Sequence, residues 1–93
     1  MVDQERVVLI DSLVEDFGRA VRDFRIRSGI TLQDMAFIIS CSPSYIWRIE
    51  AHRRNPEVDF RIRVLNQAMG FSAEDICLYL EKYMEKNKSA SEV

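Results

Sequence analysis

Ten arginines, all before residue 64, are the side chains in this sequence that most directly suggest a chemistry. A guanidinium donates two parallel hydrogen bonds to a phosphate or to the edge of guanine, whereas dense Lys and Glu are common on any solvated helix. Catalysis has no comparable support, because the chain has one histidine, His52, no glycine-rich phosphate loop and no nucleophile, base and acid set. We therefore expect a binding protein, not an enzyme, with no cofactor and no metal.

The charge of the chain is distributed unevenly, although its formal net charge is only −2. Residues 1–16 carry a net charge of −4, residues 17–70 carry +4, and residues 71–93 carry −2. The middle of the chain is therefore suited to an anionic partner such as the DNA backbone. Taken one at a time, most of these arginines are equally well explained as solvated charge on helix surfaces.

Length, cysteine content and hydropathy place the chain in a broad class. Its 93 residues, 47% of them hydrophobic, suit a single globular domain. Cys41 and Cys77 lie 36 residues apart without a CxxC pattern, so we expect buried small side chains and no redox or zinc site. No apolar run approaches the ~20 residues that span a bilayer, and no signal peptide is evident. We expect a soluble, cytoplasmic protein without a membrane partner.

The apolar residues near the N-terminus recur with helical spacing. Between Val7 and Phe24 they alternate at steps of three and four, which predicts one long helix that Gly29 ends. In an alternative interpretation, Ser12 and a glutamate three residues later form a capping box that starts the helix at Leu13. Residues 7–10 would then be a separate arm or short strand. We favour the continuous helix.

Helix caps, and for residues 58–69 the spacing of apolar residues, predict four more helices after this one. Thr31 with Asp34, and Ser72 with Asp75, have capping-box spacing, and Ser42 precedes a proline at a first helical position. The predicted helices cover residues 32–39, 43–51, 58–69 and 73–87. A frayed polar tail is expected over residues 88–93. The elements are therefore all helical.

Residues 32–51 have the spacing of a helix-turn-helix motif. Ala36 is a small residue where two helices would cross, Ser40 lies in the turn, and Ile46 and Ile49 lie three apart on an inner face. The stretch GITLQDMAFIISCSPSYIWRIEAHRRNP resembles the Cro and lambda-type repressor family of helix-turn-helix proteins, the XRE family. The resemblance begins at Phe17-Gly18 and continues, with about one inserted residue, to Ile76.

The resemblance implies a fold and a division of the chain. The fold is all-α, a five-helix lambda-repressor-like DNA-binding domain with an extended N-terminal helix. Residues 1–16 form a helical extension or arm, residues 17–70 the helix-turn-helix core, and residues 71–93 a C-terminal dimerisation helix with a short tail. Ser40 and His52 occupy positions where the family usually has Gly, so Ser40 is expected to strain a left-handed backbone modestly. His52 is interpreted as a turn residue.

The same resemblance makes residues 43–51 the recognition helix that enters the major groove. With Ile46 and Ile49 buried, the opposite face is expected to meet base edges through Pro43, Ser44, Trp47 and Arg48. Arg48 is the strongest candidate, since a guanidinium matches the O6 and N7 acceptors of guanine. Its alternative roles are a phosphate contact or an ion pair with Glu50, which resembles the family's structural acid. The expected phosphate contacts are Gln33, Ser42, Tyr45, Arg53, Arg54 and Arg22, with Arg25 and Arg27 extending the positive surface.

Two of these residues have alternative roles: Tyr45 could half-pack on the domain, and Trp47 could contact a partner protein.

The chain has more apolar residues than the core of one small domain can bury, which predicts a homodimer interface. Its expected members are Phe60, Val64, Leu78, Tyr79, Leu80 and Tyr83.

The expected function is a dimeric transcription regulator, a repressor that binds a palindromic operator in double-stranded DNA. The alternative is a protein-interaction module with the same fold, such as an anti-repressor. Arginines gathered on the recognition-helix face favour DNA, and dispersed arginines favour the alternative.

Overall fold

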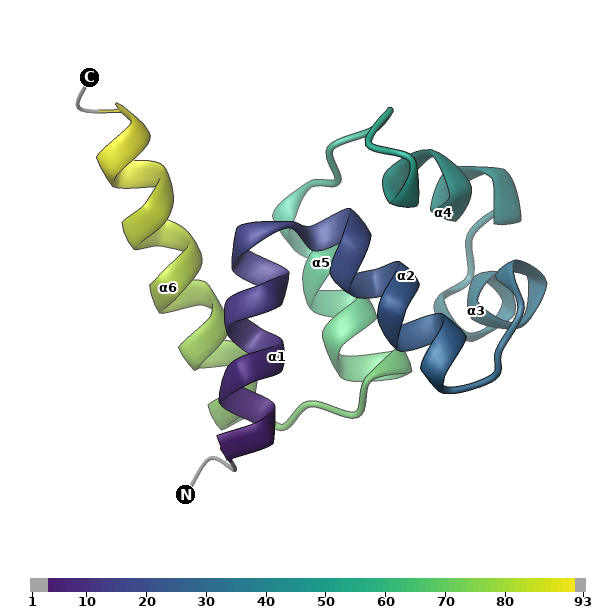
Figure 1. Cartoon of the computed structure of the whole chain (residues 1–93), viewed down its shortest axis with the longest axis horizontal. Coiled ribbons are helices and arrows are strands. Elements are labelled where there is room, and N and C mark those ends of the chain that lie inside the picture. Colours follow the sequence, from purple (N-terminus) through teal and green to yellow (C-terminus); the bar gives the residue numbers. More distant parts are fainter. Residues whose placement is uncertain (1–3, 92–93) are drawn as a thin grey trace.

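The computed structural model describes residues 4–91, and the side chains of residues 4–88. These residues form six α-helices and one π-helical segment, without a strand, so the predicted all-α fold is confirmed (Figure 1). The elements are α1 (Gln4–Glu15), α2 (Phe17–Arg27), α3 (Leu32–Ile39), α4 (Pro43–Glu50), α5 (Val58–Arg63), η1 (Val64–Ala68) and α6 (Ala73–Ser91). Helix α6 continues to Ser91, beyond its predicted end, and residues 92–93 of the predicted tail lie outside the described residues.

The N-terminal region is two helices that meet at Asp16, so both interpretations of its start were wrong. Asp16 has extended backbone, with φ −152°, and its carboxylate accepts a hydrogen bond from the amide of Arg19 at 3.1 Å. Asp16 is therefore the N-cap of α2. Ser12 caps no helix, because its hydroxyl donates to the Val8 carbonyl within α1. Both helices bury one side in the same core, so the spacing of their apolar residues resembles that of one continuous helix.

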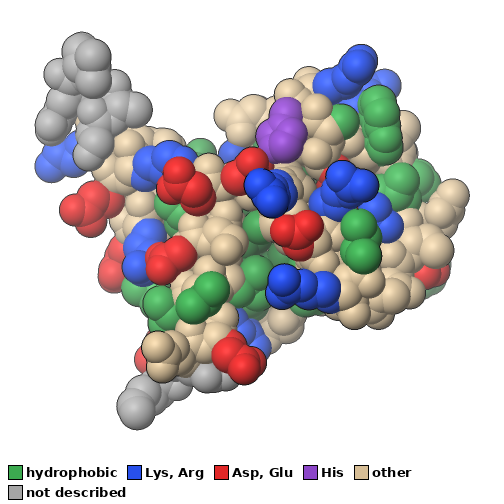
Figure 2. All heavy atoms as spheres, in the orientation of Figure 1, with side chains coloured by type: hydrophobic (Ala, Val, Ile, Leu, Met, Phe, Trp, Pro, Cys, Tyr) green, Lys and Arg blue, Asp and Glu red, His purple; other side chains and the backbone are tan. Residues whose placement is uncertain are grey.

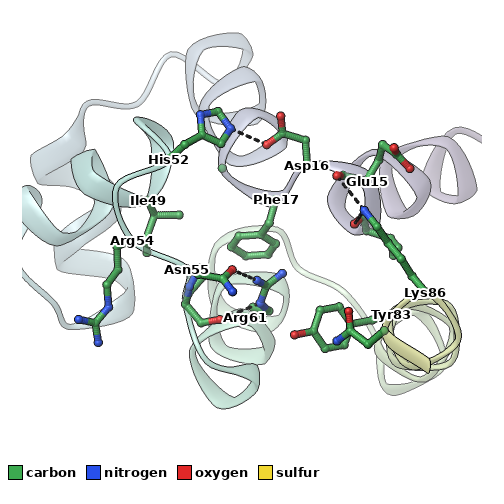
Figure 3. Close-up of a pocket in the computed structure, with 14 residues that line it drawn as sticks. Glu15, Asp16, Phe17, Ile49, His52, Arg54, Asn55, Arg61, Tyr83 and Lys86 are labelled. Carbon is green, nitrogen blue, oxygen red and sulfur yellow. Dashed lines mark hydrogen bonds and ion pairs between the residues drawn. The ribbon is translucent and has the colours of Figure 1, made fainter. Parts of the chain in front are cut away.

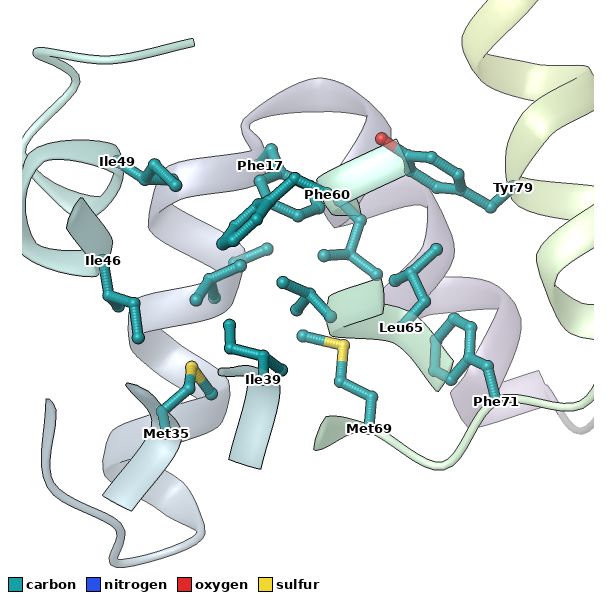
Figure 4. Close-up of a cluster of buried hydrophobic side chains, with 14 of the residues drawn as sticks. Phe17, Met35, Ile39, Ile46, Ile49, Phe60, Leu65, Met69, Phe71 and Tyr79 are labelled. Atoms are coloured by element: carbon teal, nitrogen blue, oxygen red, sulfur yellow. The ribbon is translucent and has the colours of Figure 1, made fainter. Parts of the chain in front are cut away.

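The core is a single cluster to which every helix contributes (Figure 4). Helix α1 contributes Ile10 and Leu13, and α6 contributes Tyr79. Helices α1 and α6 pack side by side and run in the same direction (Figure 1). The polar contacts between them run from the Arg6–Asp75 pair, near the start of both helices, to the bond from Lys86 of α6 to the Glu15 carbonyl at the end of α1. Helices α1 and α6 thus form one helix pair against the α2–α5 core.

Three residues of the predicted dimer interface are buried within the chain. Phe60, Val64 and Tyr79 are 6%, 1% and 0% exposed, so they cannot form a surface for a second copy. Leu78, Leu80 and Tyr83 are partly buried against the same core. Two features that the spacing of apolar residues does not reveal explain the error. Helix α1 covers α6, and the wider turn of η1 directs both Val64 and Leu65 inward.

The two cysteines differ in environment. Cys41 is half-buried, and burial raises the pKa of its thiol. Cys77 is exposed on α6, so the prediction that it would be buried was wrong. Between residues 4 and 91, no three His, Cys, Asp or Glu side chains lie together as a metal site would require. Within the same range, no helix has the length and apolar character needed to cross a membrane.

Candidate nucleic-acid interface

Local hydrogen bonds fix the ends of α3 and the turn that follows it. The amide of Thr31 and the carboxylate of Asp34 bond at 3.0 Å, as do the Asp34 amide and the Thr31 hydroxyl, so the predicted capping box is confirmed. These bonds hold the pKa of Asp34 below its usual value. Ser40 is left-handed, with φ 56° and ψ 54°, as expected for a residue in the glycine position. The Cys41 amide then donates to the Ala36 carbonyl and closes the turn.

Helix α4 begins as predicted, with Ser42 as N-cap and Pro43 at the first position. The Ser42 hydroxyl accepts the Tyr45 amide at 3.2 Å. Ile46 and Ile49 are buried, which fixes the inner face of the helix. Gly18 of α2 lies directly against α4, because a Cβ there would overlap the Ile49 carbonyl oxygen. The approach of α2 to α4 therefore requires glycine.

A buried ion pair ties the end of α4 to α2. The Arg25 guanidinium donates to both carboxylate oxygens of Glu50, at 2.8 and 3.0 Å, and also to the Ile30 carbonyl. The hydrogen bonds that Arg25 donates to the Glu50 carboxylate raise the pKa of Arg25. Glu50 is thus a structural acid, and it is not the partner of Arg48. Arg25 faces inward and does not extend the positive surface, contrary to expectation.

The outer face of α4 carries the predicted base-contacting residues. Ser44, Trp47 and Arg48 are exposed, with Trp47 48% exposed, and Pro43 is half-buried at the start of the helix. All lie away from the buried Ile46 and Ile49. The structure therefore brings these four residues together on one helix, and their contacts with bases stay a prediction.

Aromatic rings hold the two arginines that follow α4. The Arg53 guanidinium lies 5.5 Å from the ring centroid of Trp47, and that of Arg54 lies 5.5 Å from Tyr45. Tyr45 itself is half-buried and packs edge-on against Phe60 at 4.8 Å, its predicted alternative role. A left-handed His52, with φ 61°, turns the chain between α4 and these arginines. Cation–π contact restricts both guanidinium groups before any ligand binds.

The remaining predicted phosphate contacts are distributed around this surface. Gln33 on α3 and Arg22 on α2 are exposed, while the Ser42 hydroxyl is already engaged as a helix cap. The nine arginines of residues 17–70 divide into three sets. Arg48, Arg53 and Arg54 lie on α4 and its loop, Arg19, Arg22 and Arg27 on the exposed side of α2, and Arg25, Arg61 and Arg63 face inward.

The space-filling view shows the consequence of this division (Figure 2). Arginine side chains, with a few acidic ones between them, stand out over the α2 and α4 part of the molecule, whereas acidic and basic side chains alternate over the α1–α6 pair. The arginines are neither all gathered on the recognition helix nor evenly dispersed. Six of the nine remain exposed on α2, α4 and the loop that follows α4.

Arg61 is a structural residue that sequence reasoning missed. Its guanidinium donates to the Pro56 carbonyl at 2.9 Å, the Asn55 side chain at 2.6 Å and the Tyr79 hydroxyl at 3.1 Å. Its bonds to Asn55, drawn in Figure 3, and to Tyr79 thereby join the loop after α4 to α6. Burial raises the pKa of Tyr79, although the bond from Arg61 opposes that shift. No sequence pattern separates Arg61 from its exposed counterparts, because all of its partners come from other elements.

Residues 16–76 match the family model described as a helix-turn-helix domain, which spans about two thirds of the chain. The chain therefore belongs to the helix-turn-helix domain family. This membership agrees with the resemblance to XRE-type proteins and indicates a DNA-binding regulator. Searches of curated proteins and of solved structures found no match.

Proposed function

We propose that this protein is a sequence-specific transcription regulator, a repressor that binds a palindromic operator as a dimer in the prokaryotic cytoplasm. The observation that carries the proposal is the division of α4 into two faces. Ile46 and Ile49 anchor it, and Ser44, Trp47 and Arg48 remain exposed. An anchored helix with exposed polar and aromatic side chains suits insertion into the major groove. We expect Arg53 and Arg54, which lie over Trp47 and Tyr45, to contact flanking phosphates.

Arg48→Ala tests this proposal on the preferred site obtained by selection from random duplex. Loss of a bidentate guanine contact is expected to cost about 1–3 kcal/mol of binding free energy on that site. Binding to random duplex should change less, because that binding is mostly electrostatic. Arg19→Ala, which removes an exposed arginine from α2, is the matched control and should leave base preference intact. Equal losses of binding free energy on both duplexes would mean that Arg48 contacts phosphate and does not read a base.

The dimer requires a surface other than the buried residues first predicted. Met84 on α6 is 66% exposed, and Leu78 and Leu80 on the same helix are partly buried. We assign the dimer contact to this part of α6, since exposed apolar area on a small domain favours association. Met84→Glu should shift the mass measured by light scattering from dimer to monomer, while Met84→Leu should not. A monomeric wild type at tens of micromolar would refute this part of the proposal.

One observation favours the second candidate, a protein-interaction module. Phe37 on α3 is 88% exposed, and Ile38 beside it is 39% exposed. Apolar side chains this accessible suit a protein partner better than a phosphate backbone. If the module binds protein instead of DNA, Phe37→Gln should abolish partner binding, and the wild type should select no DNA site. If the chain is a DNA-binding repressor, Phe37→Gln should leave operator affinity within about twofold.

A further inference from the structure

A cavity of about 300 Å³ lies between the loop after α4, the junction of α1 with α2, and α6 (Figure 3). This volume is at the lower end of the range for small-ligand sites. Its walls include Arg61 and Asn55 on one side and Tyr83 and Lys86 on the other. The cavity is separate from the exposed face of α4, and the proposed DNA contacts do not use it, apart from Arg54 at its edge.

The most buried charged group of this cavity is a cation without an anion. Arg61 is only 5% exposed, and its three hydrogen bonds go to neutral oxygens of Asn55, Pro56 and Tyr79. Its guanidinium lies 4.7 Å from the ring centroid of Phe17 and 4.9 Å from that of Tyr83. No carboxylate among residues 4–88 forms an ion pair with it. Burial of a charge is costly unless a counter-charge compensates it.

The other charged residues that line the cavity are Glu15, Asp16, Arg54 and Lys86. The Lys86 ammonium bonds only the carbonyl oxygens of Val14 and Glu15, each at 3.1 Å. The Asp16 carboxylate is bonded to His52 at 2.7 Å. Figure 3 shows the side chain of Arg54 and the carboxylate of Glu15 pointing away from the other labelled residues. Two cations with neutral partners thus face a space of ligand size.

We infer that this cavity binds a small, free oxyanion, of the phosphate or carboxylate class, held between Arg61 and Lys86. The bound anion supplies the counter-charge that Arg61 lacks, and Asn55 and the Tyr83 hydroxyl offer neutral hydrogen bonds beside it. The anion would also sit behind the loop that carries Arg53 and Arg54. A further consequence rests on the proposed function: the bound anion should weaken DNA binding, because the anion lowers the positive potential of that loop.

The experiment uses inorganic phosphate as the probe, with the full chain and without DNA. Amide and arginine side-chain NMR signals are followed during titration with sodium phosphate, against sodium chloride at matched ionic strength. We expect saturable shifts at Asn55, Arg61 and Lys86. Lys86→Gln should raise the apparent Kd about tenfold, because it removes one of the two charge-assisted hydrogen bonds to the anion. Lys82→Gln, which alters a lysine of the same helix bonded to Asp11, should leave the Kd unchanged.

Two results would overturn the inference. Shifts that do not saturate, or equal losses in the Lys86 and Lys82 variants, would mean a general salt effect without a site. A DNA affinity that falls in Lys86→Gln in phosphate-free buffer would assign the cavity to the DNA backbone in place of a free anion. Because the titration contains no DNA, its outcome is independent of whether the protein binds an operator.

Discussion

The recognition unit, α2–α4, and the terminal pair, α1 with α6, are stabilised in different ways. Within α2–α4 the contacts are mostly between near neighbours in sequence, such as the capping box at Thr31, completed by the buried Arg25–Glu50 pair. The terminal pair joins residues about 70 positions apart through the side-chain pairs Arg6–Asp75 and Lys82–Asp11. Such partly exposed pairs contribute little, so the buried Ile10, Leu13 and Tyr79 must hold the terminal helices in place.

This difference shows where the geometry of the interface originates. The recognition unit sets the direction of α4 by itself, through Gly18, Ile46, Ile49 and Glu50. The terminal pair connects to the loop after α4 through Arg61 of α5, which bonds Tyr79 of α6, and through Asp16 at the junction of α1 with α2, which bonds His52. We therefore expect changes in the recognition unit to alter stability and DNA binding together. Changes in the terminal pair should alter stability first.

The largest expected effect comes from the buried ion pair of the recognition unit. Arg25→Ala leaves the Glu50 carboxylate buried without a partner, which should lower the free energy of unfolding by about 3–5 kcal/mol. Arg22→Ala, on the exposed side of the same helix, is the control and should change it by less than about 0.5 kcal/mol. Urea unfolding measures both. Similar small losses would show that the pair does not stabilise the recognition unit.

The corresponding change in the terminal pair is Ile10→Ala. Ile10 is fully buried, so the cavity should cost about 2–5 kcal/mol. Val8→Ala, on an exposed position of α1, should cost less than about 0.5 kcal/mol. Native-state hydrogen exchange sharpens the comparison: in Ile10→Ala the amides of α6 should lose more protection than those of α3. Equal loss in both helices would mean that the two regions unfold as one unit.

A smaller effect is expected where α2 meets α4. Gly18→Ala places a methyl group against the Ile49 carbonyl, and separating the helices should cost about 1–3 kcal/mol. Operator affinity should fall as well, because α4 must move. Thermal unfolding and a binding titration test both effects, with Arg19→Ala as the neighbouring control. An unchanged melting temperature in Gly18→Ala would contradict the close contact between the helices.

The smallest effect concerns the bond between the two regions. Burial alone would raise the pKa of Asp16, but hydrogen bonds from His52 and the Arg19 amide outweigh it, so the pKa lies below its usual value. Asp16 therefore stabilises the fold above its unfolded pKa of about 3.9, and this contribution disappears as pH falls through the lower folded pKa. Asp16→Asn should make unfolding stability less dependent on pH in that range. Asp23→Asn, an exposed control, should keep the wild-type dependence.

The same contrast explains what the sequence could predict. The caps at Thr31, Ser42 and Ser72 act within three residues, so the starts of α3, α4 and α6 were predicted correctly. The two-faced α4 followed from the spacing of Ile46 and Ile49. The break at Asp16 was missed because α1 and α2 share one apolar stripe, although Asp16 has the side chain of an N-cap.

Features that depend on distant residues could not be predicted in this way. The packing of α1 on α6 is long-range, and without it α6 seemed to have a spare apolar face. The π-helical turn at Val64–Ala68 changes the helical period, so a wheel drawn at a constant 100° per residue misplaces the residues around it. The role of Arg61 arises only when Asn55, Phe17 and Tyr83 meet around it.

Binding-site selection followed by a salt titration tests the central claim, that the recognition unit reads DNA through α4, most directly. The wild type should select a palindromic site and lose affinity at about 0.9 log unit per phosphate contact for each log unit of salt. Arg53→Ala combined with Arg54→Ala should flatten that slope by up to about two contacts and leave base preference nearly intact. A wild-type protein that selects no site and shows no steep salt dependence would contradict the claim.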